Sequence, residues 1–237
     1  MNILALETSA QSCSVALQIA DSGDQNAVRV FDLRDTEKLS HSRRLLPMVE
    51  SLLKEADTDI AQLDYIAVTQ GPGSFTGLRI GIAAAQGLAF ALALPAVPIS
   101  SLAVVAFNAQ QQMPGLAEHH YVLATLDARM GELYCGWYDI SAGIPMLVGA
   151  ECVVKPGELP PLAAPCGQSV RQAIVGSGLV YREQISTDYL SDIDIVEDAT
   201  VPDARALLAL ANHAVGEQSA VHAEALTPVY LRNNVTY

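Results

Sequence analysis

The first half of the chain alternates short hydrophobic runs with polar turns in an order that predicts strands before helices. Three apolar runs of strand length come first, and an Asp-, Gly- and Asn-rich turn between the second and third favours an antiparallel meander; the runs are residues 3–6, 13–19 and 27–33. Residues 39–56 then carry apolar side chains at helical spacing, with Pro47 inside. Because proline removes an amide donor, we expect a kink or two abutting helices there.

Alternating strands and helices follow this opening. The order predicted for the first half is βββαβαβα, completed by strands at 65–69 and 97–99 and helices at 81–93 and 101–112. The second half restarts with strands, becomes irregular among several prolines, and closes with a helix; its predicted elements are 121–126, 132–140, 173–175 and 203–215.

The helix predicted over residues 81–93 is small or apolar on every side. A helix without a polar face must be covered all round, so we expect one side to face its own sheet and the other to face another helix or another chain. We do not expect it to span a membrane, because Arg79 lies at its start, Gln86 in its middle and Pro95 at its end, which leaves fewer than the ~20 apolar residues required.

The charge and composition of the chain argue against several classes of function. The 237 residues carry a net charge of -13, with only 13 Lys plus Arg, so the chain lacks the basic field that unassisted nucleic-acid binding needs. Its four cysteines form no CxxC pair, and its five histidines show no i, i+4 pair. We therefore predict no metal site and no disulfide framework. A reduced cytoplasmic protein without a secretory signal is expected.

A first candidate phosphate site lies in the turn between the first two predicted strands. Its polar residues are Glu7, Thr8, Ser9 and Ser12. A carboxylate and hydroxyls in such a turn can hold phosphate and magnesium, but Ser and Thr are also common in ordinary polar turns. From spacing alone, the polar hairpin is the favoured interpretation.

The glycine-rich segment GPGSFTG, which includes Gly71 and Gly73, is a second candidate. Backbone amides at the start of the following helix are able to bind an anion. The segment is neither a Walker loop nor a dinucleotide fingerprint. A structural turn and a phosphate cradle remain equally supported alternatives.

The second half holds two weaker candidates. Asp127 and Arg129 lie at a predicted hairpin turn, where charged residues are usually only solvated, and Gly176 and Gly178 form a common type of turn after a strand. No GxSxG elbow is present and no histidine has a neighbouring carboxylate in a recognisable setting, so we predict no catalytic residue. Peptidase activity is not expected, since neither a metal triad nor an activated nucleophile is apparent.

Taken together, several segments resemble one family over residues 1–235. These segments, in order, are ILALETSAQSCSVAL, HSRRLLPMVESLL, GPGSFTGLRIGIAAAQGLA, LDARMGELY, VGSG and PVYLRNNV. The sequence is similar to the bacterial TsaB (YeaZ) family of tRNA threonylcarbamoyladenosine biosynthesis subunits. The resemblance implies an α/β, two-lobed fold of the actin, Hsp70 and sugar-kinase type, with ribonuclease H-like lobes at 1–103 and 104–237. The second lobe is expected to be reduced, and the last segment to pack back on the first lobe or meet a partner.

The resemblance also implies a role without catalysis. Members of this family are partners of a larger catalytic paralogue, TsaD, and of the ATPase TsaE. The complex transfers a threonylcarbamoyl group to the adenosine next to the anticodon of tRNAs that read ANN codons. The paralogue's HxxxH motif is absent from this sequence. We expect no cofactor of its own, with ATP and Mg²⁺ used by the complex, and contact with tRNA only through the complex.

The two helices around residues 45–53 and 82–92 together offer more apolar surface than one half-domain covers, so we expect them to form the partner interface, or a homodimer interface when the chain is alone. The predicted interface residues are Leu45, Leu46, Val49, Leu52, Leu53, Ile82, Ala85, Gln86 and Ala89. Two alternatives stay open: a stand-alone ATP-dependent kinase or ATPase of the same fold, and a regulatory dimer unrelated to tRNA.

Overall fold

The computed structural model describes residues 1–20, 27–37, 41–162, 170–196 and 201–232. The chain divides into two compact units. The first contains residues 1–101 and 202–229, and the second contains residues 102–201 and the segment from 230 onward. The break after residue 101 lies next to the boundary expected at residue 103, but residues 202–229, expected in the second lobe, belong to the first unit.

A five-stranded sheet in the order β3-β2-β1-β4-β5 forms the centre of the first unit. Its strands are β1 (Ile3–Glu7), β2 (Cys13–Ala20), β3 (Val28–Asp35), β4 (Tyr65–Gly71) and β5 (Ala96–Ser100). β1, β2 and β3 pair antiparallel, whereas β4 and β5 extend the sheet parallel to β1. The predicted meander is confirmed, although its turn at residues 21–26 lies outside the described residues.

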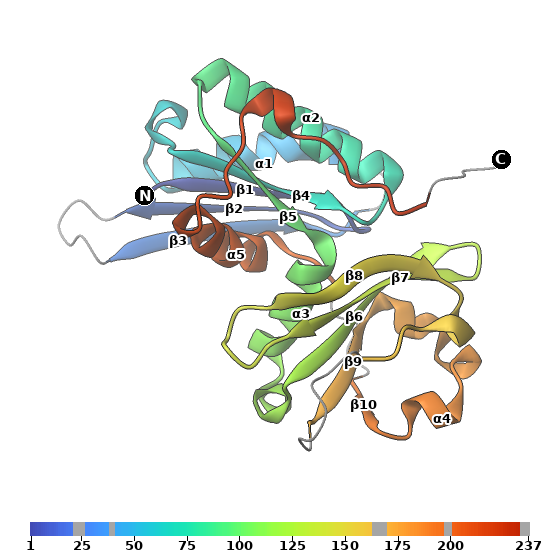
Figure 1. Ribbon diagram of the computed structural model, residues 1–237. Helices are drawn as coiled ribbons and strands as arrows, with labels where there is room; N and C mark the ends of the chain where they lie inside the picture. The colour runs from blue at the N-terminus through green and yellow to red at the C-terminus, as the bar shows by residue number, and fades with distance from the viewer. Residues whose placement is uncertain (21–26, 38–40, 163–169, 197–200, 233–237) are drawn as a thin grey trace. The chain divides into compact units, whose positions relative to one another are not determined.

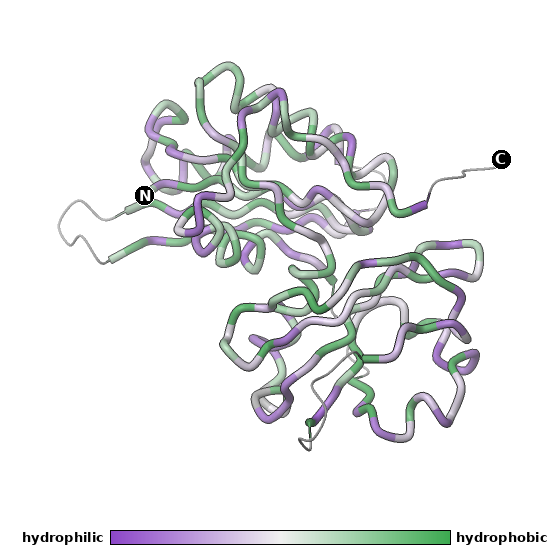
Figure 2. Tube along the Cα trace, viewed as in Figure 1, coloured by the Kyte–Doolittle hydropathy of each residue, from purple (hydrophilic) through white to green (hydrophobic). Residues whose placement is uncertain are grey.

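Helices cover both faces of this sheet (Figure 1). α1 (His41–Glu55) and α2 (Phe75–Leu92) pack on one face, and α5 (Ala204–Gly216) packs against β1, β2 and β5 on the other. Since side chains alternate along a strand, Leu4 and Leu6 belong to the core beneath α1 and α2, while Ile3 and Ala5 point to the opposite face. Figure 2 shows hydrophobic residues along these central strands.

α1 continues through Pro47 as a single helix, so the expected split into two helices does not occur. Pro47 is exposed, and the turns that follow it bury Met48, Val49 and Leu52 in the core. Packing of this apolar face maintains the helix despite the missing amide. The short helix η1 (Ile60–Gln62) then leads into β4, and η5 (Ala223–Ala225) packs on α2.

The second unit repeats the strand order of the first. Its sheet, read from the opposite edge, runs β8-β7-β6-β9-β10, with β6, β7 and β8 antiparallel and β9 and β10 parallel to β6. The strands are β6 (Tyr121–Arg129), β7 (Glu132–Asp139), β8 (Met146–Val154), β9 (Gln172–Gly176) and β10 (Ile193–Ile195). Two sheets of one topology confirm the expected two-lobed fold.

The second unit is reduced in its helices and not in its strands. α3 (Ser101–Gln112) packs on its sheet. The other helices in the described part of this unit are short; they are η2 (Pro114–Glu118), η3 (Pro156–Glu158), η4 (Ser177–Gln184) and α4 (Thr187–Leu190). The strands β8 and β10 were not predicted. β8 has no clean alternation, with Met146 and Leu147 exposed at the sheet edge, and β10 is only three residues long.

The closing helix α5 joins the first unit through specific contacts. The Ala204 amide donates to Ser14 Oγ at 2.9 Å, and the Asn212 and Gln18 side-chain amides hydrogen-bond to each other. Leu207 and Leu208 are buried in the same unit. The apolar face of α5 is covered by the first sheet. This helix therefore belongs to the first unit, although it follows the second unit in sequence.

α2 is long and apolar enough to cross a membrane when only length and composition are considered. It instead packs on β4 and buries one side, including Leu78, Ile82 and Ala85. A core helix of this composition satisfies the same length and hydropathy test.

Candidate functional site

The turn after β1 lies against the start of α2. Ser9 O accepts a hydrogen bond from the Ser74 amide at 2.7 Å, and Thr8 Oγ1 donates to Gly77 O at 2.8 Å. The Gly77 amide is capped locally, since Ser74 Oγ accepts from it at 3.2 Å. Two backbone segments that were separate candidate sites in the sequence therefore form one packed structural unit.

The glycines of this segment allow the backbone of the β1–β2 turn to approach closely. A Cβ added at Gly73 would lie within 3.0 Å of Ser9 O, and one added at Gly77 would lie within 3.0 Å of Thr8 O. Gly71 has a φ of 117° and would meet Val229 O in the same way. Carbonyl oxygens occupy the space that an anion cradle needs, so the geometry favours the structural-turn alternative over the phosphate cradle.

The polar residues of the β1–β2 turn are buried. Thr8 is 0% and Ser9 2% exposed, and Ser12 Oγ accepts from the Arg34 guanidinium at 3.2 Å. Side chains that are already enclosed and hydrogen-bonded within the chain do not present a free phosphate-binding surface. The polar-hairpin interpretation therefore fits these residues better than a working nucleotide site.

Glu7 of the first unit is a buried acid with a raised pKa. It is fully buried, and its Oε1 accepts hydrogen bonds from the Ser9 amide and Ser9 Oγ, both at 2.6 Å. Burial raises the pKa of Glu7 to about 6, and the hydrogen bonds from Ser9 oppose this rise only in part. Within the described part of the chain, neither Glu7 Oε2 nor Thr69 Oγ1 has a hydrogen-bond partner. The carboxyl group is shifted toward neutral pH but has no exposed surface on which to act.

The candidates of the second unit also have structural partners. Asp127 Oδ1 accepts from the Arg129 amide at 2.7 Å and from the Tyr181 hydroxyl at 2.9 Å, while Asp127 Oδ2 pairs with Arg129 at 3.0 Å. Cβ atoms added at Gly176 or Gly178 would collide with Thr125. The charged hairpin tip and the glycine turn are therefore stabilised by contacts within the unit.

The C-terminal segment makes local contacts at both of its described ends. The Val229 amide donates to Gln70 O at 2.7 Å in the first unit. In the second unit, Arg232 donates to Ala128 O at 3.2 Å and pairs with Glu132. Asn233 and Asn234, named with Arg232 in the motif YLRNNV, lie outside the described residues.

Most residues predicted at the partner interface instead form the core of the first unit. Six are at most 4% exposed, and they are Leu45, Val49, Leu52, Ile82, Ala85 and Ala89. Leu53 is half-buried against the same core, and Gln86 Nε2 donates to Leu226 O at 2.7 Å. Only Leu46 is largely exposed, at 48%. The predicted residues therefore lie mainly on the sheet-facing side of each helix, which is buried within the unit.

The opposite side of α2 leaves an apolar stripe uncovered in the chain alone. This stripe, called here the exposed helix face, consists of Ala83, Gly87, Phe90 and Ala91 on α2; Ile80 at its edge is half-buried against the core, and Leu46 is exposed on α1. Phe90 is 72% exposed. A Cβ at Gly87 would meet nothing within 4 Å among the described residues, so none of their contacts requires glycine at this position.

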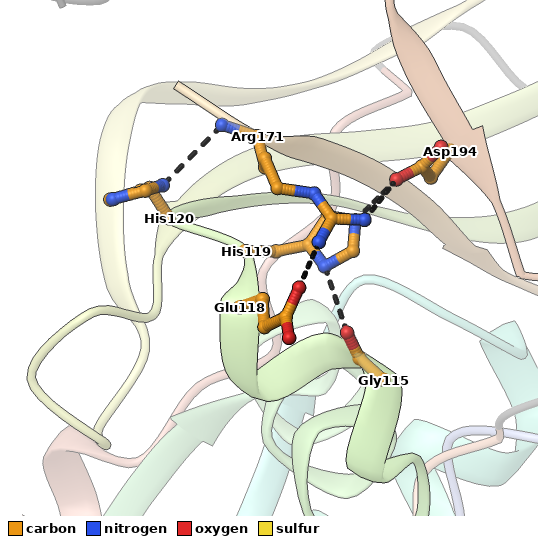
Figure 3. A network of polar contacts seen from close by, with 6 residues as sticks. All are labelled: Gly115, Glu118, His119, His120, Arg171 and Asp194. Carbon is orange, nitrogen blue, oxygen red and sulfur yellow. Dashed lines mark hydrogen bonds and ion pairs between the residues drawn. The ribbon is translucent and has the colours of Figure 1, made fainter. Parts of the chain in front are cut away.

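A polar cluster in the second unit was not anticipated from the sequence (Figure 3). The ring of His119 is 5% exposed and lies between Gly115 O, 3.1 Å from Nδ1, and an Asp194 oxygen, 2.8 Å from Nε2. Arg171 also donates to Asp194 at 3.0 Å and pairs with Glu118. These contacts lower the pKa of Asp194, the His119 hydrogen bond contributing most. A histidine with a carboxylate partner was wrongly excluded, because the two residues are distant in sequence and β10 was not predicted.

This cluster connects the end of η2 to β10 through hydrogen bonds and ion pairs, which is typical of a structural role. Both ring nitrogens of His119 face oxygen acceptors, which leaves no free nitrogen for proton transfer. Within the described residues, no three His, Cys, Asp or Glu side chains converge as metal ligands.

Comparison with known proteins identifies the family. The sequence model of TsaD, tRNA N6-adenosine threonylcarbamoyltransferase, matches residues 36–236. Two relatives named tRNA threonylcarbamoyladenosine biosynthesis protein TsaB come from Escherichia coli (strain K12) and Haemophilus influenzae (strain ATCC 51907 / DSM 11121 / KW20 / Rd). They are 35% and 32% identical, and each alignment covers 100% of this chain and 97% or 96% of the relative.

Solved structures agree with this assignment. YeaZ from Pseudomonas aeruginosa matches with a TM-score of 0.82 and 37% identity, covering 97% of this chain and 99% of that one. A second structure, described as an uncharacterized protein with similarity to peptidase YEAZ from Pseudomonas aeruginosa, matches with a TM-score of 0.84 and 36% identity over 98% of this chain and 99% of that one. The chain therefore belongs to the TsaB (YeaZ) family, within the wider family described by the TsaD model.

Proposed function

We propose that this chain is a non-catalytic cytoplasmic subunit required for threonylcarbamoyl transfer to tRNA, and that it acts by binding a TsaD-like catalytic paralogue. In this proposal a TsaE-like ATPase joins the complex, ATP and Mg²⁺ serve the complex, and tRNA is contacted through the partner. Alone, the chain forms a homodimer through the same surface. Membership of the TsaB family and the net charge of -13 both support this role.

One structural observation carries the proposed mode of binding. Gly87 lies in the middle of α2, where glycine costs about 1 kcal/mol relative to alanine, and no described residue lies within 4 Å of a Cβ added there. Gly77 and Gly81 of the same helix are explained by contacts with Thr8, but Gly87 is not. With Ala83 and Ala91 one turn to either side, it leaves a shallow, small-residue surface on which a second helix is able to pack closely.

The surroundings of this surface fit a protein partner. Phe90 lies on the same face as Gly87 and supplies a larger apolar side chain for contact, with the half-buried Ile80 at the edge of this face. α2 is held firmly by its buried side and by its cap at Ser74, so the exposed helix face is presented on a rigid element. A rigid apolar surface of this kind is more typical of a protein interface than of a substrate site.

The test compares binding of the paralogue from the same cell to the wild-type chain and to Ala83→Glu. The proposal expects complex formation to fall at least ~100-fold in affinity, because a charge enters an apolar helix contact. Ala142→Glu, an equally exposed alanine in the second unit, is the control and should bind normally. Unchanged binding by Ala83→Glu would contradict the proposed surface.

The cellular role is tested separately. Depletion of the chain should remove threonylcarbamoyladenosine from tRNA, with rescue by the wild type and Ala142→Glu but not by Ala83→Glu. A normal level of the modified nucleoside after depletion would favour the regulatory dimer unrelated to tRNA. ATP turnover or peptide hydrolysis by the isolated chain would favour a stand-alone enzyme.

A further inference from the structure

Two cysteines of the second unit lie side by side although 17 positions separate them in sequence. Cys135 on β7 and Cys152 on β8 are directly opposite partners in the antiparallel ladder, and their sulfur atoms are 3.5 Å apart. Residues directly opposite each other in such a ladder have Cα atoms about 4.5–5.5 Å apart, which lies within the range that a disulfide bridges. The sulfurs therefore need to approach by only about 1.5 Å to reach bonding distance.

From this juxtaposition we infer that Cys135 and Cys152 form an oxidisable dithiol site, which a low-molecular-weight disulfide converts into a cross-strand disulfide. The inference does not depend on the proposed function. It concerns a covalent modification of the β7–β8 pair and neither the exposed helix face nor the partner.

The two thiols differ in access, and this difference sets the order of the reaction. Cys135 is fully buried among apolar residues that include Leu133 and Trp137, whereas Cys152 is half-buried near the end of the edge strand. Burial and the neighbouring Cys152 raise the pKa of the Cys135 thiol, which makes it a poor nucleophile while the strands are closed. Attack on an external disulfide must therefore begin at Cys152.

The chemistry balances in two exchange steps. The Cys152 thiolate attacks a sulfur of oxidised glutathione, forms a mixed disulfide and releases one glutathione thiolate, which takes up the proton. The Cys135 sulfur then attacks Cys152 Sγ, forms the protein disulfide and releases the second glutathione. Two protein thiols are oxidised and one glutathione disulfide is reduced to two thiols.

Local backbone features accommodate the small closing movement. The β7–β8 pairing is irregular between Cys135 and Trp137, and the residue between these two is Gly136. Glycine and a bulge allow local adjustment that a regular ladder of larger residues resists. Reversible dithiols of this kind are the form in which disulfides usually occur in reducing compartments.

The experiment treats the full folded chain carrying Cys166→Ser with oxidised glutathione, then blocks the remaining thiols under denaturing conditions. Cleavage after glutamate separates the two cysteines into peptides 133–151 and 152–158, so these peptides remain joined only through a disulfide. The expected product is this linked pair, with Cys13 blocked as a free thiol, because Cys13 is fully buried and burial raises its pKa to about 12. In the same chain unfolded in urea, Cys13 is no longer buried, so Cys13 should be modified as well.

Single variants test the order of attack. Cys135→Ser should accumulate one glutathione on Cys152, and Cys152→Ser should leave Cys135 modified at least ~10-fold more slowly. Free thiols at both positions after treatment, or a linked pair involving Cys13, would overturn the inference. Equal modification of Cys135 in the Cys152→Ser variant would overturn the proposed order. Reduction with dithiothreitol should restore both thiols and the original melting temperature.

Discussion

Thr8 O lies so close to the α carbon of Gly77 that no side chain larger than hydrogen fits between the β1–β2 turn and the start of α2. This contact explains why a glycine-rich segment resembling an anion-binding loop is instead a packing motif. The same turn uses Thr8 Oγ1 to approach Gly81, one turn further along the helix. The two glycines therefore allow α2 to approach β1, and they position the whole helix.

Alanine substitutions should distinguish the packing glycines from Gly87. Gly77→Ala must displace a backbone carbonyl and is expected to lower the free energy of unfolding by about 1–3 kcal/mol or more. Gly87→Ala meets no neighbour and should raise it by about 0.5–1 kcal/mol, since alanine is the better helix former. Urea unfolding of both variants measures the difference, and similar effects of the two would contradict this assignment.

Replacing Glu7 should change how stability depends on pH. Its folded-state pKa, about 6, is raised above its ordinary value of 4.5 by burial. The stabilising contribution of the neutral form is complete below pH 4.5 and is lost as pH rises through 6, with about 2 kcal/mol lost at pH 8. Glu7→Gln should therefore be more stable than the wild type at pH 8 and similar to it at pH 4.

The control for this titration is Glu50→Gln, at an exposed position on α1. It should shift the stability curve little at either pH. Urea unfolding at several pH values gives the comparison. If Glu7→Gln lost stability at pH 8, the carboxylate would have an ionised partner that the geometry does not show.

Asp194 should contribute stability in the opposite pH direction. The contacts with His119 and Arg171 lower the pKa of Asp194, so its contribution is present at neutral pH and disappears as pH falls through the folded-state pKa. Because the Asp194 side chain is 59% exposed, solvent screening limits the effect of Asp194→Asn to about 1 kcal/mol or less at pH 7. Thermal melts at pH 7 and pH 4 test this, with the exposed Asp192→Asn as a charge-matched control.

Two substitutions separate folding from partner binding on the helices. Ile82 is 4% exposed and belongs to the core, so Ile82→Glu is expected to lose about 3 kcal/mol or more of stability and to unfold much of the first unit. Leu46→Asp changes a side chain that is 48% exposed and should preserve the fold while weakening the partner contact. Circular dichroism and urea unfolding measure whether each variant is folded and how stable it is. A stable Ile82→Glu variant would contradict the assignment of Ile82 to the core.

The sequence predicted the strand and helix order of the first unit well, because strong periodicity and glycine turns define its elements. It failed where local signals are weak. β8 has apolar residues exposed at a sheet edge and β10 has three residues, so neither shows a clear pattern. Without β8 the pairing of Cys135 with Cys152 was invisible, and without β10 the contact between His119 and Asp194 was equally hidden.

The residues predicted at the partner interface show a second limit of prediction from the hydrophobic pattern. α2 is apolar on all sides, so its hydrophobic pattern does not reveal which side faces the sheet. Only the packing of Ile82 and Ala85 against the core, together with the open space at Gly87, distinguishes the two sides. The sequence therefore identified an apolar helix but could not show which of its sides is buried within the unit.

Light scattering after size exclusion, on this chain alone and mixed with the TsaD-like paralogue from the same cell, tests the central claim most directly. The account predicts a homodimer that is replaced by a one-to-one heterodimer, and predicts that Ala83→Glu prevents both while Ala142→Glu prevents neither. Failure to form any complex, with or without nucleotide and the TsaE-like ATPase, would contradict it.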